Sequence, residues 1–225
     1  DIRGIIDETL DPAIAKLSGQ AFGTEMRELG ESDIVIGRDG RLSGPSLIEA
    51  LTEGLLSTGI NVIDLGMVAT PMVYFAANHM INGKTPKSGI MITGSHNPPN
   101  YNGFKMVLGT AAIYGEKIQE LRKRIEAKQF ATGQGTRSTF DIFPMYINYI
   151  VGDIKLARPM KIAVDCGNGV GGAFAGKLFR ALGCEVQELF CEVDGHFPNH
   201  HPDPAHIENL QDLIKNLQTT DNELG

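Results

Sequence analysis

The chain has 225 residues, 42% of them hydrophobic and 21% charged, which is typical of a globular protein. Its 27 acidic residues against 20 lysines and arginines give a net charge of −7 and argue against non-specific binding to nucleic acid or an anionic membrane. The three cysteines lack a C-x-x-C spacing, so we expect reduced thiols in a cytoplasmic protein. No signal peptide is visible, and the absence of an initiator Met predicts a piece of something longer.

The first half of the chain predicts a parallel strand–helix–strand unit. Residues 33–37 form a short β-branched run that a glycine closes, and Pro45 then opens a helix in its first turn. Gly59 ends this helix, and a second strand follows at residues 60–65. Residues 65–83 are uncharged but interrupted by Pro71, so we expect a buried core segment and no membrane helix.

The same pattern returns near residue 160 and predicts a second domain. A strand at residues 160–165 is followed by a glycine-rich turn at 167–172, a helix, and a strand at 184–190. Before it lie an amphipathic helix around Leu121 and a polar stretch, residues 131–139, that we predict to be a loop.

The fold class is therefore α/β, with two related α/β domains. We place a complete domain at residues 1–152 and a partial, similar one at 153–225.

A candidate site follows the strand predicted at residues 90–92. The loop after it contains Ser95, His96 and Asn97, followed by two prolines that stiffen the chain. Loops at the carboxyl ends of strands are the usual ligand sites of open α/β sheets. The alternative is a simple turn, for which serine, asparagine and proline are the expected composition.

Five segments, in order along the chain, resemble motifs of the α-D-phosphohexomutases. Residues 93–98 (T-G-S-H-N-P) are similar to the phosphoserine loop of that family, and residues 1–4 (D-I-R-G) to its N-terminal active-site segment. Residues 37–41 (G-R-D-G-R) and 102–105 (N-G-F-K) resemble two further motifs, and residues 165–169 (D-C-G-N-G) resemble the opening of the second domain.

The resemblance implies three-layer α/β/α domains around mixed sheets. It also implies a reaction in which a phosphoserine at Ser95 gives its phosphoryl group to a hexose phosphate. A 1,6-bisphosphate forms and then returns the other phosphate, and the same bisphosphate is the expected activator. Arg3 is expected to clamp phosphoryl oxygens, because a guanidinium binds them in a bidentate manner. Lys105 is expected to stabilise charge and carry the proton of the attacking hydroxyl, and His96 to orient the loop or the phosphate.

The family also implies Mg²⁺, held by a Ser95 phosphate oxygen and by an aspartate loop, D-G-D-G-D-R, that these residues do not contain. We therefore expect the 225 residues alone to bind Mg²⁺ weakly and not to turn over. The expected partners are hexose phosphates and the C-terminal domains of the same chain, and neither nucleic acid nor membrane.

Residues 192–204 indicate the branch of the family, because they resemble the corresponding segment of bacterial phosphomannomutase/phosphoglucomutase. This predicts mannose or glucose phosphate, with phosphoglucosamine mutase as the alternative. The two hexoses are not distinguished, because the sugar-reading domain of the family lies outside these residues.

Three other patterns offer alternatives of a different class. Gly167, Gly169 and Gly172 form a literal G-x-G-x-x-G after a strand, which is the fingerprint of dinucleotide-binding oxidoreductases, or simply a tight turn. The histidine-rich segment 200–206 suggests zinc or a structural loop. Cys184 and Cys191 flank a predicted strand, and we expect both to be buried and inert.

Overall fold

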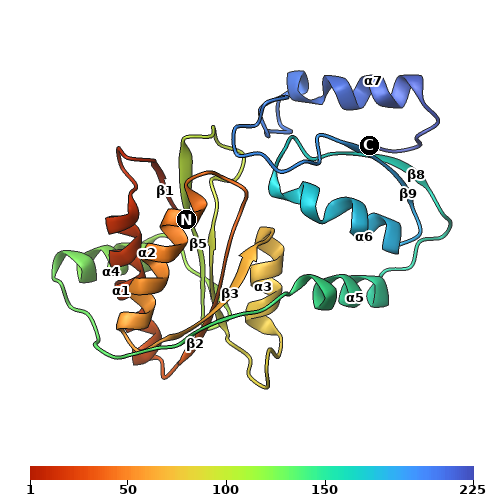
Figure 1. Cartoon of the computed structure of the whole chain (residues 1–225). Coiled ribbons are helices and arrows are strands. Elements are labelled where there is room, and N and C mark those ends of the chain that lie inside the picture. Colours follow the sequence, from red (N-terminus) through yellow and green to blue (C-terminus); the bar gives the residue numbers. More distant parts are fainter. The chain divides into compact units, whose positions relative to one another are not determined.

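A computed structural model describes the whole chain, residues 1–225 (Figure 1). It contains two compact units. The first comprises Asp1–Ser95 and Asn100–Asp141, and the second comprises His96–Pro99 and Ile142–Gly225. None of the helices combines the length and the apolar character needed to cross a membrane.

The first unit contains a seven-stranded mixed sheet in the order β1-β5-β4-β2-β3-β7, with β6 paired to β5. Its strands are β1 (Ile2–Ile5), β2 (Asp33–Arg38), β3 (Asn61–Met67), β4 (Ser88–Ile92), β5 (Tyr101–Leu108), β6 (Ala111–Ala112) and β7 (Arg137–Thr139). β4, β2, β3 and β7 pair in parallel, whereas β5 is antiparallel to its neighbours β1, β4 and β6. The carboxyl ends of β2 and β4 therefore meet at one edge of the sheet.

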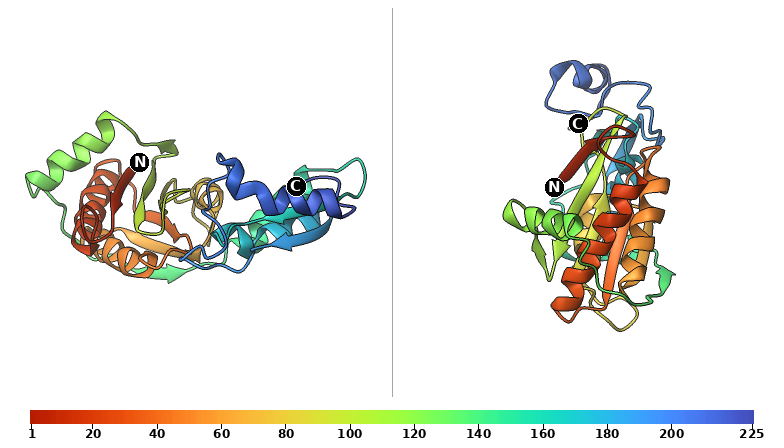
Figure 2. Two further views of the ribbon diagram at one scale, coloured as in Figure 1. Left: turned by 90° about the horizontal axis from the view of Figure 1, so that it is seen from above. Right: turned by 90° about the vertical axis from the view of Figure 1, so that its left-hand side faces the viewer.

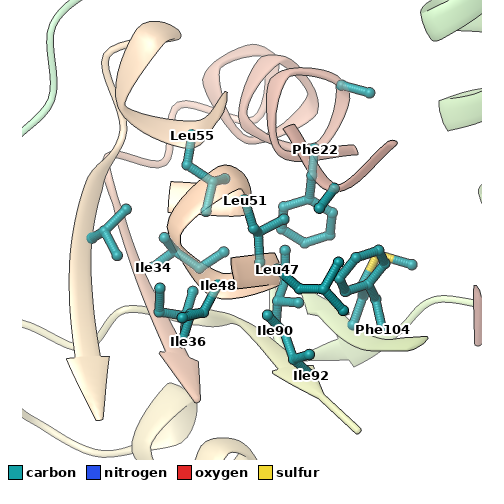
Figure 3. Close-up of a cluster of buried hydrophobic side chains, with 14 of the residues drawn as sticks. Phe22, Ile34, Ile36, Leu47, Ile48, Leu51, Leu55, Ile90, Ile92 and Phe104 are labelled. Atoms are coloured by element: carbon teal, nitrogen blue, oxygen red, sulfur yellow. The ribbon is translucent and has the colours of Figure 1, made fainter. Parts of the chain in front are cut away.

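Helices cover both faces of this sheet, as the sequence predicts (Figures 1 and 2). They are α1 (Pro12–Glu28), α2 (Gly44–Ser57), α3 (Thr70–Asn78) and α4 (Glu116–Glu126). α1 and α2 pack on each other and on one face, where the largest cluster of buried side chains lies (Figure 3). The cluster includes Phe22, Ile34, Ile36, Leu47, Leu51, Leu55, Ile90, Ile92 and Phe104. α3 packs on β2 and β4 and contributes Met72, Val73, Ala76 and Ala77 to the core.

The predicted strand–helix–strand unit corresponds to β2, α2 and β3, and the segment at residues 65–83 contains the inward-facing α3. The prediction of a loop over residues 131–139 is wrong at its end, where β7 pairs in parallel with β3. The strand forms although all three of its residues are exposed. Its first residue, Arg137, donates to Glu49 and Asp64, so contacts far along the chain stabilise a segment whose own composition is polar.

The second unit is built on two parallel strands. Its elements are α5 (Phe143–Asp153), β8 (Lys161–Asp165), the 3₁₀ helix η1 (Val170–Ala173), α6 (Ala175–Ala181), β9 (Glu185–Leu189), the 3₁₀ helix η2 (Ile207–Leu210) and α7 (Gln211–Thr219). β8 pairs with β9 in continuous register, and α6 and α7 lie on opposite sides of the pair (Figure 1). The predicted strand, turn, helix and strand are all present.

The two compact units separate before α5, whereas the sequence places the domain boundary after residue 152. α5 contacts α6 inside the second unit, where the rings of Phe143 and Phe174 lie 5.1 Å apart. The two divisions therefore differ in the assignment of α5 and of residues 96–99, both of which belong to the second compact unit.

Candidate functional site

The serine turn, residues 93–95, leaves the first sheet at the end of β4. The backbone N–H of Thr93 still donates to the carbonyl of Gly103 on β5 at 3.0 Å. Two residues later Ser95 is exposed and has a left-handed backbone, with φ 55°. A residue other than glycine pays about 1 kcal/mol or more for this conformation, so surrounding contacts must hold it.

Asp39, in the turn after β2, supplies the first of these contacts. It is 7% exposed, and its Oδ2 accepts a hydrogen bond of 2.7 Å from the hydroxyl of Thr93. The same hydroxyl accepts a bond of 2.9 Å from the backbone N–H of Ser95. Asp39 therefore orients the Thr93 side chain so that it can bind the backbone of Ser95.

Arg41 holds the opposite side of the serine turn. Its side chain is 1% exposed, its Nε lies 3.3 Å from Asp39 Oδ2, and the Asp39 carboxylate also accepts from its backbone N–H. The two terminal nitrogens donate to the carbonyls of Tyr101 and Ser95, each at 3.0 Å. We call Asp39, Arg41 and Thr93 the cradle, because together they bind both backbone polar groups of Ser95.

The cradle also requires the glycine that precedes the serine. A Cβ atom on Gly94 would lie 2.4 Å from Cζ of Arg41 and 2.7 Å from the carbonyl oxygen of Tyr101. Any side chain at this position would displace the guanidinium. Gly94 thus allows the buried arginine to pass directly beneath the turn.

Positive charge gathers around this edge of the sheet. Burial lowers the pKa of Arg41, Asp39 opposes this, and Arg3 is close enough for its charge to lower that pKa further. An arginine nevertheless stays protonated, so the guanidinium remains a cation.

Arg3 pairs with Gly103 across β1 and β5, and Lys105 lies two residues further along β5. Directly opposed residues share a face of a sheet, so Arg3 and Lys105 project from the same face. Lys105 Nζ lies 2.7 Å from Asp1 Oδ2.

The sequence of the chain matches the family described as phosphoglucomutase/phosphomannomutase, alpha/beta/alpha domain I over residues 1–132 and alpha/beta/alpha domain II over residues 144–225. The two matches cover most of the chain. The chain belongs to the phosphoglucomutase/phosphomannomutase family. The resemblance found in the sequence motifs is confirmed.

Individual relatives agree with this assignment. The chain is 57% identical to a phosphoglucomutase of Neisseria meningitidis and 51% identical to a phosphomannomutase/phosphoglucomutase of Pseudomonas aeruginosa, in both cases over its whole length and over 48% of the relative. A crystal structure of a phosphoglucomutase/phosphomannomutase family protein from Burkholderia thailandensis superposes with a TM-score of 0.97 at 56% identity, covering 99% of this chain and 50% of that one. The chain thus spans about half the length of these relatives.

Of the four site residues predicted from the sequence, the structure places three in the first unit of this family member. Ser95, Arg3 and Lys105 all belong to the sheet edge or strands described above. His96 follows Ser95 directly and is exposed, but it falls in the second unit. Its role in orienting the loop or the phosphate stays a prediction.

Asp39, Arg41 and Thr93 were not predicted as functional residues. The G-R-D-G-R segment that contains two of them was recognised as a motif, but nothing in it shows which residue is buried. Asn102 is a further case, since it is fully buried and its side-chain amide donates to the hydroxyl of Ser43 at 2.9 Å. Thr93 opens the recognised motif at residues 93–98, and for the other three the only signal in the sequence was a charged or amide residue within a short motif next to apolar residues.

The residues present do not make a complete magnesium site. No group of three or more His, Cys, Asp or Glu side chains in the chain is placed to hold a metal ion. The histidine-rich segment does not gather around one point either, because His200 binds Asp165 at 3.0 Å while His206 lies near Asp203 and Glu208. A phosphate on Ser95 could supply one hard oxygen ligand, but further ligands must come from elsewhere.

The structure gives no support to dinucleotide binding at the glycine turn, residues 166–172. A pyrophosphate needs free backbone N–H groups at a helix N-terminus. Four N–H groups of this turn have partners within the chain: that of Gly167 donates to Asp165 Oδ1, that of Asn168 to the Phe190 carbonyl, and those of Gly169 and Gly172 to carbonyls within the turn. A 3₁₀ helix then separates the turn from α6.

Proposed function

We propose that this chain is the phosphoserine-bearing half of a hexose phosphate mutase, which interconverts hexose 1-phosphate and hexose 6-phosphate. The observation that carries the proposal is the exposed Ser95, whose left-handed backbone is bound on both sides by a buried cradle. A side chain that must accept and give up a phosphoryl group repeatedly has to be exposed and yet fixed in position. The names of the relatives point to the same activity.

In the proposed step the phosphate on Ser95 passes to the free hydroxyl of the bound hexose phosphate. The bond between the sugar oxygen and phosphorus forms as the bond between Ser95 Oγ and phosphorus breaks. The proton of the sugar hydroxyl ends on Ser95 Oγ, and Lys105 is proposed to carry it. The resulting hexose 1,6-bisphosphate turns over and returns its other phosphate to Ser95.

Cationic groups are the main catalytic requirement of such a transfer, because charge spreads over the equatorial phosphoryl oxygens. Arg3 projects from the same face as Lys105, is exposed, and can bind two oxygens at once. Arg41 differs, since its donors already bind main-chain carbonyls and the Asp39 carboxylate. Its proposed task is to position Ser95 and not to touch the phosphate.

Mg²⁺ and the activating bisphosphate remain proposals for the longer protein. When bound, Mg²⁺ would draw charge from the phosphoryl group through a Ser95 phosphate oxygen. Hexose 1,6-bisphosphate would phosphorylate a chain whose Ser95 is bare. We propose the cytoplasm as the location, in keeping with the acidic composition.

Mannose and glucose phosphates are the proposed substrates, since relatives at 51–57% identity are named for these two sugars. Glucosamine phosphate remains the alternative. We also propose the two domains predicted from the sequence, residues 1–152 and 153–225. This division falls within α5, which the compact units assign to the second unit.

The proposal is tested by mutase activity of the full-length protein on glucose, mannose and glucosamine 1-phosphates. Ser95→Ala should reduce kcat by about 10³-fold or more with the first two sugars, because the phosphoryl carrier is lost. Ser138→Ala, which changes an exposed serine on β7, is the matched control and should leave kcat unchanged. Full activity of Ser95→Ala would refute the assignment, and a preference for glucosamine phosphate would favour the alternative.

A further inference from the structure

The second unit contains two thiols in direct contact. Cys166 follows β8 and Cys191 follows β9, and their sulfur atoms lie 3.3 Å apart, with the Cys191 thiol donating to Cys166. Both residues are of intermediate exposure, whereas Cys184, at the other end of β9, is buried. The prediction that Cys191 is buried is therefore wrong, because the chain leaves the sheet at Phe190 and no element covers it fully.

The main chain holds the two thiol-bearing segments together on both sides of the contact. The N–H of Cys166 donates to the Leu189 carbonyl at 3.1 Å, and the N–H of Asn168 donates to the Phe190 carbonyl at 2.8 Å. The side-chain amide of Asn168 adds a bond of 2.9 Å to the carbonyl of Glu192. These three bonds fix the spacing of the segments independently of the thiols.

The spacing suits a covalent link. The two sulfur atoms, 3.3 Å apart, are already in contact and have to approach to about 2.05 Å for a disulfide to form. The chain also passes very close to the glycine turn, because a Cβ on Gly172 would lie 2.0 Å from the carbonyl oxygen of Cys191.

We propose that Cys166 and Cys191 are an oxidisable dithiol that closes to an intramolecular disulfide when the protein meets a low-molecular-weight disulfide such as glutathione disulfide. The link joins the ends of β8 and β9 and encloses the glycine turn and α6. It is independent of the mutase activity proposed above, since it involves no residue of the cradle.

The reaction proceeds by two exchanges that balance in electrons and protons. The thiolate of one cysteine attacks a sulfur of glutathione disulfide, which forms a mixed disulfide and releases one glutathione. The thiolate of the second cysteine then attacks the protein sulfur of the mixed disulfide and releases the other glutathione. The dithiol loses two electrons and two protons, and glutathione disulfide is reduced to two thiols.

The surroundings make the exchange slow at neutral pH. Burial raises the pKa of Cys166, and the contact with Cys191, in which Cys166 keeps its proton when Cys191 ionises, raises it further, as do the charges of Asp165 and Glu188. Burial also raises the pKa of Cys191, although its hydrogen bond to Cys166 lowers it in part. Cys191 is therefore the first attacker, and closure should speed up as the pH rises.

The carboxylates that face the thiols have partners of their own. Asp165 is bound by His200 and Glu188 by Arg180, and these are the charged groups around the pair.

The test is to incubate the 225-residue chain with millimolar glutathione disulfide at about pH 8.5, where thiol exchange is fast enough to follow. Unreduced peptide mapping by mass spectrometry should find Cys166 joined to Cys191, with a mass about 2 Da below that of the two thiol peptides. Cys184 should remain a thiol. Closure should also raise the unfolding temperature of the second unit by several degrees, since it links segments 25 residues apart.

Three single variants sharpen the result. Cys184→Ser should close as the parent chain does, whereas Cys166→Ser and Cys191→Ser should each stop at a mixed disulfide with glutathione. The same oxidation in guanidinium chloride should give links among all three cysteines, because the fold no longer selects a pair.

Other outcomes would overturn the proposal. These are mixed disulfides that persist on Cys166 and Cys191 in the folded chain, a link to Cys184 without denaturant, or a Cys166–Cys191 link that forms only in denaturant. A folded chain that stays fully reduced while the unfolded chain oxidises would count equally against it.

Discussion

The serine turn and the glycine turn each place one residue in the left-handed backbone region, but they differ in whether that residue is exposed or buried. Each follows a parallel strand, contains a glycine, and places a residue other than glycine in the left-handed region, Ser95 at φ 55° and Asn168 at φ 58°. An aspartate binds each turn: Asp39 accepts from the Thr93 hydroxyl, and Asp165, whose side chain is 5% exposed, accepts from the Gly167 N–H. Yet Ser95 is exposed, whereas Asn168 is 4% exposed.

The difference lies in what each side chain does. Asn168 donates to the Glu192 carbonyl and accepts from the Asn199 amide at 2.8 Å, so its side chain ties the second unit together. The contacts that hold Ser95 in the cradle go to its main-chain groups. One turn uses the side chain of its left-handed residue for stability and the other leaves that side chain exposed, as the proposed phosphoryl transfer requires, although both residues have similar φ angles.

Among the variants that test this comparison, loss of Arg41 should have the largest effect on stability and activity. Arg41→Met leaves Asp39 buried without its cation, which we expect to cost about 3–5 kcal/mol of unfolding free energy. In the full-length protein kcat should also fall, by about 10²-fold, because Ser95 loses its anchor while KM changes little. Calorimetric unfolding and mutase assays measure the two effects.

Arg122→Met is the matched control for this variant, since Arg122 forms an exposed pair with Glu126 and should cost less than about 0.5 kcal/mol. Adding Asp39→Asn to Arg41→Met should restore part of the stability but not kcat. Normal kcat in Arg41→Met would show that the cradle does not position Ser95.

Replacing each left-handed residue by alanine should distinguish the two turns directly by the change in unfolding free energy. Asn168→Ala removes two hydrogen bonds and places a less tolerant residue at φ 58°, so we expect a loss of about 2 kcal/mol. Ser95→Ala also places alanine at a positive φ, 55°, but keeps both main-chain bonds to the cradle, so we expect a smaller loss, of about 1 kcal/mol or less. Urea unfolding followed by circular dichroism measures both.

Asn168→Gly provides the control for the backbone, because glycine adopts a positive φ without strain. It should recover only the part of the loss that is due to conformation. Equal effects of Asn168→Ala and Ser95→Ala would remove the distinction between a structural turn and a presenting turn.

The smallest expected effect is a pH dependence in the second unit. Burial lowers the pKa of His200, but the His201 carbonyl and the Asp165 carboxylate outweigh it, and the pKa is raised on balance. The stabilisation is therefore complete below the unfolded value, about 6.5, and is lost as the pH rises through the higher folded value. We expect at most about 1 kcal/mol between about pH 6 and pH 9.

Unfolding temperatures across this range measure the effect. His200→Asn should remove the dependence, whereas His206→Asn, at an exposed histidine, should preserve it. A stability that instead rises with pH in the parent chain would contradict the sign of the shift.

The sequence predicted those parts of the molecule that depend on local pattern. β2, α2 and β3, and later β8, α6 and β9, follow from β-branched runs, prolines and glycines, and the motif around Ser95 predicted the exposed serine. β5 was missed, since Asn102, Gly103 and Lys105 interrupt its apolar residues and its stability comes from pairing on both sides.

The cradle could not be predicted in the same way. Arg41 binds carbonyls that lie 54 and 60 residues further along the chain, and no spacing within a motif shows this. The contact between Cys166 and Cys191 was missed for the same reason, because it depends on where two strands end side by side.

The most direct test of the account is the position of the phosphate. The full-length protein should be incubated with hexose 1,6-bisphosphate and its phosphopeptides mapped, with Ser95→Ala and Ser138→Ala treated in parallel. We predict one phosphate, on Ser95, which is absent in Ser95→Ala and retained in Ser138→Ala. A bare Ser95 in the treated parent protein, or a phosphate on another residue, would contradict the central claim that the cradle presents this serine for phosphoryl transfer.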